Sequence, residues 1–111
     1  MWMTLNEYQA LAQRTSNRTL EMKGHLFNGV LGLAGEAGEC ADLVKKHYFQ
    51  DGRLFVDGLE DELGDVLWYV AETAAALGLT LEDVATRNVE KLKKRYPEGF
   101  DAERSLHRNE R

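Results

Sequence analysis

The fold of this chain is decided by two stretches, LGLAGEAGEC at residues 31–40 and LEDELGDVLW at residues 59–68. In both stretches apolar residues recur at intervals of three and four, and the pattern continues over about residues 24–48 and 59–77. This spacing places apolar side chains on one face of an α-helix. We therefore predict two long amphipathic helices over these ranges, with their apolar faces packed together.

Shorter helices are expected on both sides of this pair. Thr4 followed by Glu7 forms a capping-box pattern that predicts a first helix of about ten residues. Thr80 with Asp83 begins a last helix, which Pro97 ends. The residues around 49–56 predict a loop, because a hairpin there would be too short to pair stably alone. We expect an all-α, four-helix bundle over residues 1–100, with a frayed polar tail over residues 101–111.

Composition limits the classes of function. The chain has 111 residues and a net charge of −5, which argues against binding nucleic acid through its phosphates. Cys40 is the one cysteine, so an internal disulfide and a thiolate zinc site are excluded. No apolar run is long enough to span a membrane, and residues 1–11 do not resemble a secretion signal. We therefore expect a cytoplasmic protein without a membrane partner.

Each long predicted helix carries two carboxylates three residues apart: Glu36 with Glu39, and Glu62 with Asp65. One such pair alone is more often a solvated face. However, both pairs border the apolar stripes, so packing the stripes together would bring all four carboxylates to one seam. There they would repel each other unless a divalent cation bound among them. Carboxylates without a histidine at the i+3 position suit Mg²⁺, or Mn²⁺ as a substitute, better than iron.

Two other groups of residues border this predicted seam. Gly29 and Gly32 lie on the carboxylate side of their helix, where they provide either space for metal and phosphate or close packing of two helices. On the last helix, Asn88, Lys91 and Arg95 share an arc and could face phosphates. By spacing alone, an ordinary solvated basic helix end is the simpler explanation of these three residues.

These motifs together resemble the MazG-like nucleotide pyrophosphohydrolases. The resemblance covers about residues 25–100 and rests on GEAGE at 35–39, ELGDVLWY at 62–69, NVEKL at 88–92 and RYP at 95–97. One position differs, because Gly35 stands where this family often has the first glutamate of a double-Glu block. That difference bears on the number of metal ions and on turnover.

The resemblance implies an all-α fold shared with dimeric dUTPases and phosphoribosyl-ATP pyrophosphohydrolase. It implies a homodimer or a homotetramer built as a dimer of dimers, and hydrolysis of a nucleoside triphosphate to the monophosphate and pyrophosphate. Four residues are implied as catalytic Mg²⁺ ligands and three as contacts to the substrate phosphates. The Mg²⁺ ligands are Glu36, Glu39, Glu62 and Asp65, and the phosphate contacts are Asn88, Lys91 and Arg95.

The sequence also bears on the proton acceptor and on competing functions. We expect Glu39 to accept a proton from the attacking water, because it lies further from the apolar stripe. The competing functions are a phosphoribosyl-ATP or dUTP hydrolase of the same fold, or a non-catalytic helical module that binds a nucleotide or a partner. The residues that could approach a base are more simply assigned to core, interface or surface; they are Tyr8, His25, Phe27, Asn28 and Trp68.

Apolar residues outside the main stripes predict an oligomer. Trp68 lies far around its helix from Leu63 and Val70, and Phe27 and Leu31 widen the apolar surface of the other long helix. Apolar patches larger than a few hundred Å² are unusual on soluble monomers. A twofold interface would bury the same patch on both copies.

Overall fold

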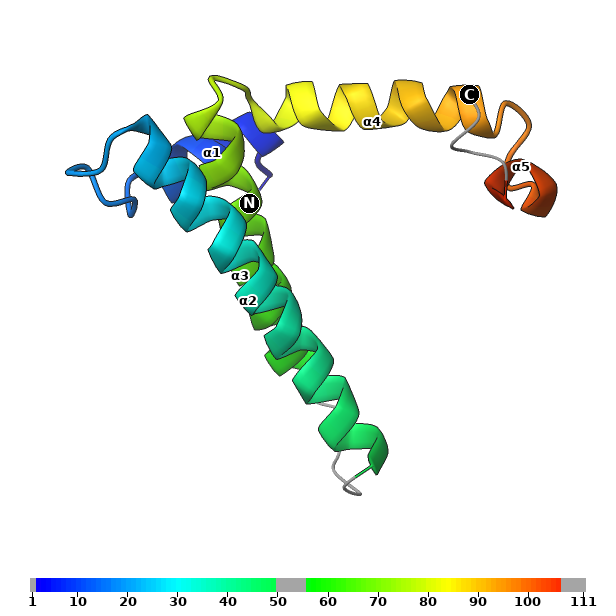
Figure 1. The fold of residues 1–111 in the computed structure, drawn as a ribbon, viewed down its shortest axis with the longest axis horizontal. Coiled ribbons are helices and arrows are strands. Elements are labelled where there is room, and N and C mark those ends of the chain that lie inside the picture. The colour runs from blue at the N-terminus through cyan, green and yellow to red at the C-terminus, as the bar shows by residue number, and fades with distance from the viewer. Residues whose placement is uncertain (1, 50–55, 107–111) are drawn as a thin grey trace. The chain divides into compact units, whose positions relative to one another are not determined.

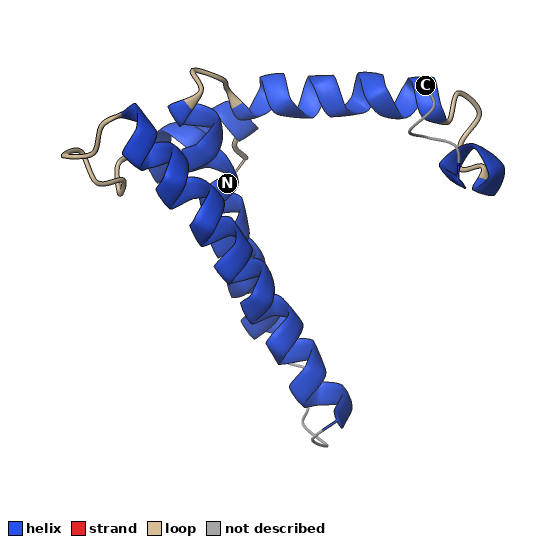
Figure 2. Ribbon diagram, in the orientation of Figure 1, coloured by secondary structure: helices blue, strands red, loops and turns tan. Residues whose placement is uncertain are grey.

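The computed structural model describes residues 2–49 and 56–106, and within this part the chain is helical, without strands (Figures 1 and 2). The helices are α1 (Leu5–Gln13), α2 (Met22–Phe49), α3 (Val56–Ala76), α4 (Leu81–Arg95) and α5 (Ala102–Leu106). The all-α prediction is therefore confirmed. The loop predicted around Asp51 lies outside the described residues, and the short helix α5 occurs where we expected a frayed tail.

Local sequence explains where helix α1 begins and where helix α3 ends. The Glu7 backbone N–H donates to Thr4 Oγ1 at 3.0 Å, and the Thr4 N–H donates to Glu7 Oε1 at 2.8 Å, so the predicted capping box is present. The same hydrogen bonds lower the pKa of Glu7. Helix α3 ends just before Gly78, whose φ of +73° is a left-handed conformation that glycine adopts readily.

Helices α2 and α3 run side by side (Figure 1). Their close approach depends on Gly29 and Gly32. A Cβ atom at Gly29 would overlap the Thr73 hydroxyl, and one at Gly32 would overlap the ring of Tyr69. The two glycines therefore give their space to side chains of α3, as the helix-packing explanation predicts.

Helix α1 packs on α3 through the buried side chain of Gln9. Its Nε2 donates to the carbonyl oxygens of Ala71 at 3.3 Å and Leu79 at 3.1 Å, and its Oε1 accepts from the Leu81 N–H at 2.9 Å. A small buried core of Ala71, Ala74 and Leu81 lies next to it. Gln9 thus bonds three backbone groups around the end of α3, and an apolar residue would remove its hydrogen bonds to the Leu79 carbonyl and the Leu81 N–H, which lie outside that helix.

The chain divides into two compact units, residues 1–81 and 82–111. In the second unit, three apolar side chains of α4 are partly exposed: Val84, Val89 and Leu92 are 38%, 47% and 42% exposed. Leu81, the first residue of the helix, belongs to the first unit and is buried. Among the described residues, no helix has both the length and the apolar character needed to cross a membrane.

Candidate metal centre

Three of the four predicted carboxylates meet across α2 and α3. One carboxylate oxygen from each of Glu36, Glu62 and Asp65 lies within 4.8 Å of the other two. Glu36 and Glu62 are half-buried, and Asp65 is exposed. The two helices are held in this register by the glycine contacts with Tyr69 and Thr73. Carboxylate oxygens at this spacing are a donor set that suits a hard divalent cation.

The electrostatics of the group point the same way. Burial, a hydrogen bond with Glu36 and the charges of Glu36, Asp65 and Glu39 all raise the pKa of Glu62. Glu39 is outside the group of three but close enough for its charge to act on Glu62. The carboxylates thus oppose each other's ionisation, and a bound divalent cation would relieve this repulsion. The residues present fit such an ion.

Two aromatic residues form a wall next to the carboxylates. Glu36, Asp65, Trp68 and Tyr69 line a pocket of about 290 Å³. The rings of Trp68 and Tyr69 meet edge to face, with centroids 4.9 Å apart at an angle of 80°. The Trp68 indole N–H donates to Ala12 O at 3.2 Å and Thr15 Oγ1 at 2.8 Å. Trp68 is therefore covered in part by its own chain, so its position far from the apolar stripe is not an argument for an oligomer.

Two further residues qualify the site. Burial and the charge of Asp65 raise the pKa of Tyr8, so its phenol stays protonated near the carboxylates at neutral pH. At Gly35, a Cβ atom would have no neighbour within 4 Å. The MazG-like proteins often have a glutamate at this position, and the space around Gly35 would accommodate a larger side chain.

The predicted phosphate contacts all lie on α4, in the second unit. Of the three, Lys91 lines a surface pocket of about 340 Å³ together with Arg87, Glu90 and Lys94. Asn88 and Arg95 do not line it. Their contact with phosphate stays a prediction.

Sequence reasoning missed a cluster around Glu72 on α3. This carboxylate is fully buried and accepts hydrogen bonds from Gln13, Ser16, His25 and Asn28. Burial raises the pKa of Glu72, but the four hydrogen bonds outweigh burial and leave the pKa below its ordinary value. The available signal was a glutamate within the apolar run VAETAAAL at residues 70–77.

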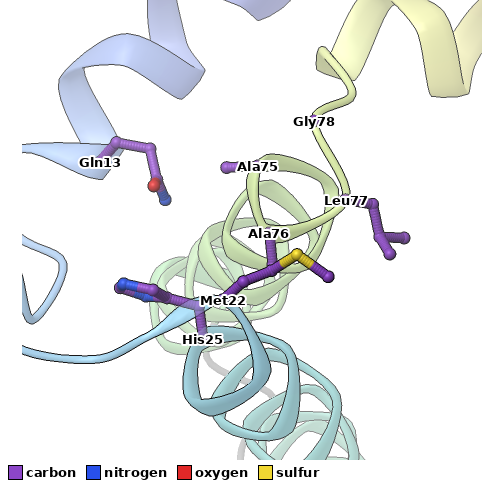
Figure 3. A pocket seen from close by; sticks show the side chains of 7 residues that line it. All are labelled: Gln13, Met22, His25, Ala75, Ala76, Leu77 and Gly78. Carbon is purple, nitrogen blue, oxygen red and sulfur yellow. The ribbon is translucent and has the colours of Figure 1, made fainter.

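Another cavity adjoins the Glu72 cluster. It has a volume of about 480 Å³ and is lined by seven residues, with Gln13 and His25 on one side and Leu77 on the other (Figure 3). Ala76, on its wall, is eleven residues along α3 from Asp65, which corresponds to about 16 Å of helix. The cavity is therefore distinct from the carboxylate site.

Part of the chain is similar in sequence to known proteins. Residues 28–100 match the MazG nucleotide pyrophosphohydrolase domain. The chain is 47% identical over 73 residues to the Gene 37 protein of Mycobacterium phage L5, over 62% of this chain and 64% of the phage protein, so the match spans less than two thirds of that relative. No solved structure matches the chain. Because the domain match covers well over half of the chain and contains all the clustered carboxylates, the chain belongs to the MazG nucleotide pyrophosphohydrolase family.

Proposed function

We propose that this chain is an Mg²⁺-dependent pyrophosphohydrolase that converts a ribo- or deoxyribonucleoside triphosphate to the monophosphate and pyrophosphate. The observation that carries the proposal is the group of Glu36, Glu62 and Asp65, whose oxygens lie within 4.8 Å of one another on two packed helices. Family membership supports a nucleotide substrate. The donor set favours Mg²⁺, with Mn²⁺ as a substitute.

The protein side of the reaction would be divided among three groups of residues. Glu36, Glu62, Asp65 and Glu39 would hold the cation. Glu39 is outside the close group of three, so it would be the ligand least engaged by the cation and would accept the proton of the attacking water. When bound, Mg²⁺ supplies positive charge to the phosphate oxygens and lowers the pKa of water. On α4, Asn88, Lys91 and Arg95 contact the substrate phosphates.

The aromatic wall supports a nucleoside rather than inorganic polyphosphate as the rest of the substrate. Trp68 and Tyr69 line the same pocket as Glu36 and Asp65. An aromatic surface beside a metal centre offers a stacking contact to a base, and stacking of this kind tolerates different bases. The proposal therefore includes a base or sugar held against Trp68 and Tyr69, next to the carboxylates.

A product assay tests this function. The purified protein is incubated with Mg²⁺ and each of the common ribo- and deoxyribonucleoside triphosphates, dUTP and phosphoribosyl-ATP, and the products are separated. We expect equimolar nucleoside monophosphate and pyrophosphate, abolished by a chelator and by Asp65→Asn purified in the same way. Release of orthophosphate and a diphosphate would contradict the proposed bond cleavage. Nucleotide binding without turnover would instead identify a non-catalytic binding module.

A further inference from the structure

Glu72 joins three parts of the first unit. Its Oε1 accepts from Gln13 Nε2 at 3.0 Å and Ser16 Oγ at 2.8 Å, and its Oε2 accepts from His25 Nδ1 at 3.1 Å and Asn28 Nδ2 at 3.2 Å. Gln13 ends α1, Ser16 lies in the connection to α2, and His25 and Asn28 belong to α2. A fully buried charge is tolerated only when hydrogen bonds satisfy it, so the carboxylate fixes the position of all four donors.

Trp68 holds the same segment of chain from one helical turn away. It lies four residues before Glu72 on α3, so both side chains project from one face of the helix. Trp68 Nε1 donates to Ala12 O and Thr15 Oγ1, and Thr15 Oγ1 in turn donates to Ala12 O at 2.6 Å. Residues 12–16 are therefore held by Glu72 on one side and supply the acceptors that orient the Trp68 indole on the other.

We infer that Glu72 is a positioning residue for the nucleoside end of the site: it fixes residues 12–16, and these residues fix the Trp68 indole beside Glu36 and Asp65. This inference rests on the proposed function, because it assigns Trp68 to the nucleoside. Glu72 touches neither the substrate nor the metal in this assignment. An apolar side chain at position 72 would fill the space but would leave the four donors without their acceptor.

Fluorescence of Trp68 tests the coupling directly. The chain has two tryptophans, and Trp2 is fully exposed, so Trp2→Phe leaves Trp68 as the reporter. In this background Glu72→Gln keeps the shape of the side chain but replaces an acceptor oxygen with a donor facing other donors. We expect red-shifted Trp68 emission and easier acrylamide quenching. The matched control is Glu21→Gln, which removes an exposed charge from the same connection and should leave the emission unchanged.

The kinetic test separates positioning from a general loss of stability. Glu72→Gln should raise the KM for the nucleotide by about five- to a hundredfold, since loss of a stacking contact between a base and an aromatic ring has effects of this size. Mn²⁺ affinity and kcat should stay within about twofold, because metal ligands are untouched. A fall in Tm with unchanged Trp68 emission and unchanged KM would overturn the inference and leave Glu72 a stabilising residue only.

Two milder variants keep the test decisive if Glu72→Gln does not fold. Ser16→Ala removes one of the four donors, and Thr15→Val removes the 2.8 Å acceptor of Trp68 without touching Glu72. Both should shift Trp68 emission, and their combination should be less than additive because they act on one segment. Unchanged emission in both variants would overturn the inference. If the wild-type protein hydrolyses no nucleotide, the proposed function fails, and the coupling is then decided by the emission of Trp68 alone.

Discussion

Gly32 and Gly38 are both inside α2, but their surroundings are opposite. A Cβ atom at Gly32 would overlap the Tyr69 ring, whereas one at Gly38 would meet nothing within 4 Å. Helix propensity favours alanine over glycine by about 1 kcal/mol at both positions. At Gly32 the steric cost of a Cβ atom exceeds this gain, because Tyr69 is held between α2 and the Trp68 ring and has little room to move.

This contrast gives a pair of stability predictions. Gly32→Ala should lower the free energy of unfolding by about 1–3 kcal/mol, the usual cost of overpacking. Gly38→Ala should raise it by about 0.5–1 kcal/mol. Urea unfolding without metal measures both. Equal effects of the two substitutions would show that Tyr69 does not pack against Gly32.

The carboxylates at the helix seam make a second prediction at this scale. Glu62→Gln or Asp65→Asn should abolish Mg²⁺-dependent pyrophosphate release, because carboxamides are much poorer ligands for Mg²⁺ than carboxylates. The far-ultraviolet circular dichroism should stay helical, since removing one of three crowded carboxylates relieves repulsion. Glu60→Gln, exposed on the same helix, is the control that should keep activity. Full activity in either site variant would exclude that residue from the metal centre.

Among the elements, the connection between α1 and α2 depends on one buried charge. Glu72 is ionised at neutral pH, where its hydrogen bonds hold its pKa below the ordinary value of 4.5. A carboxyl group with a depressed pKa in the folded state stabilises the fold at pH values above its unfolded pKa. That stabilisation is lost as the pH falls below about 4.5 and through the folded pKa.

We therefore expect a pH-dependent difference between the wild type and Glu72→Gln. The difference in their free energies of unfolding should be constant near neutral pH and should shrink as the pH falls from about 4.5 towards 3. Urea titrations at each pH measure it, and titrating groups that do not contact Glu72 cancel in the comparison. A difference that does not change over this range would mean that the folded state does not lower the pKa of Glu72.

Helix α4 carries the predicted phosphate contact that is easiest to test. Lys91→Ala should raise the KM for the nucleotide by about five- to thirtyfold, corresponding to the loss of about 1–2 kcal/mol of a charge-assisted contact. Lys93→Ala, two residues along the same helix and so on its other side, is the matched control. Mn²⁺ binding should be unchanged in both. Equal kinetics for Lys91→Ala and the wild type would mean that Lys91 is a solvated surface residue that does not contact phosphate.

The sequence predicts the features that depend on neighbouring residues and does not predict those that depend on contacts between distant parts of the chain. Periodicity and capping predicted helices α1 to α4, because these depend on local geometry. The i, i+3 spacing on two facing stripes predicted four carboxylates at one seam, and three of them, Glu36, Glu62 and Asp65, form the close group. The Glu72 cluster depends on how residues 14–21 fold back, which no local pattern encodes. The sequence allowed Gly32 either to let two helices pack closely or to make space for metal and phosphate, and the Tyr69 ring against it supports the packing role.

At the scale of the whole molecule, the single chain leaves a large apolar surface uncovered. Along α2 the exposed side chains include Phe27 at 55% and Leu31 at 71%. Helix α3, in the same unit, adds Leu63. Among the described residues the buried apolar core is small by comparison, since it consists of three alanines and Leu81 with partly buried neighbours. A domain with so little internal core is expected to complete it by association.

The last prediction is that the protein is a homodimer, or a tetramer made of two dimers, with α2 at the interface. Leu31 is the most informative position, because it is largely exposed in the single chain and points away from the Gly29 and Gly32 contacts. A charge buried at a twofold interface meets its own copy, so Leu31→Glu should dissociate the dimer. Ala10→Glu, which adds the same charge at an exposed position on α1, is the control that should not. Multi-angle light scattering at micromolar concentration should give a multiple of the 12.6 kDa chain mass for the wild type and the control. A wild-type mass of one chain would exclude the oligomer, and a Leu31→Glu protein of unchanged mass would place the interface elsewhere.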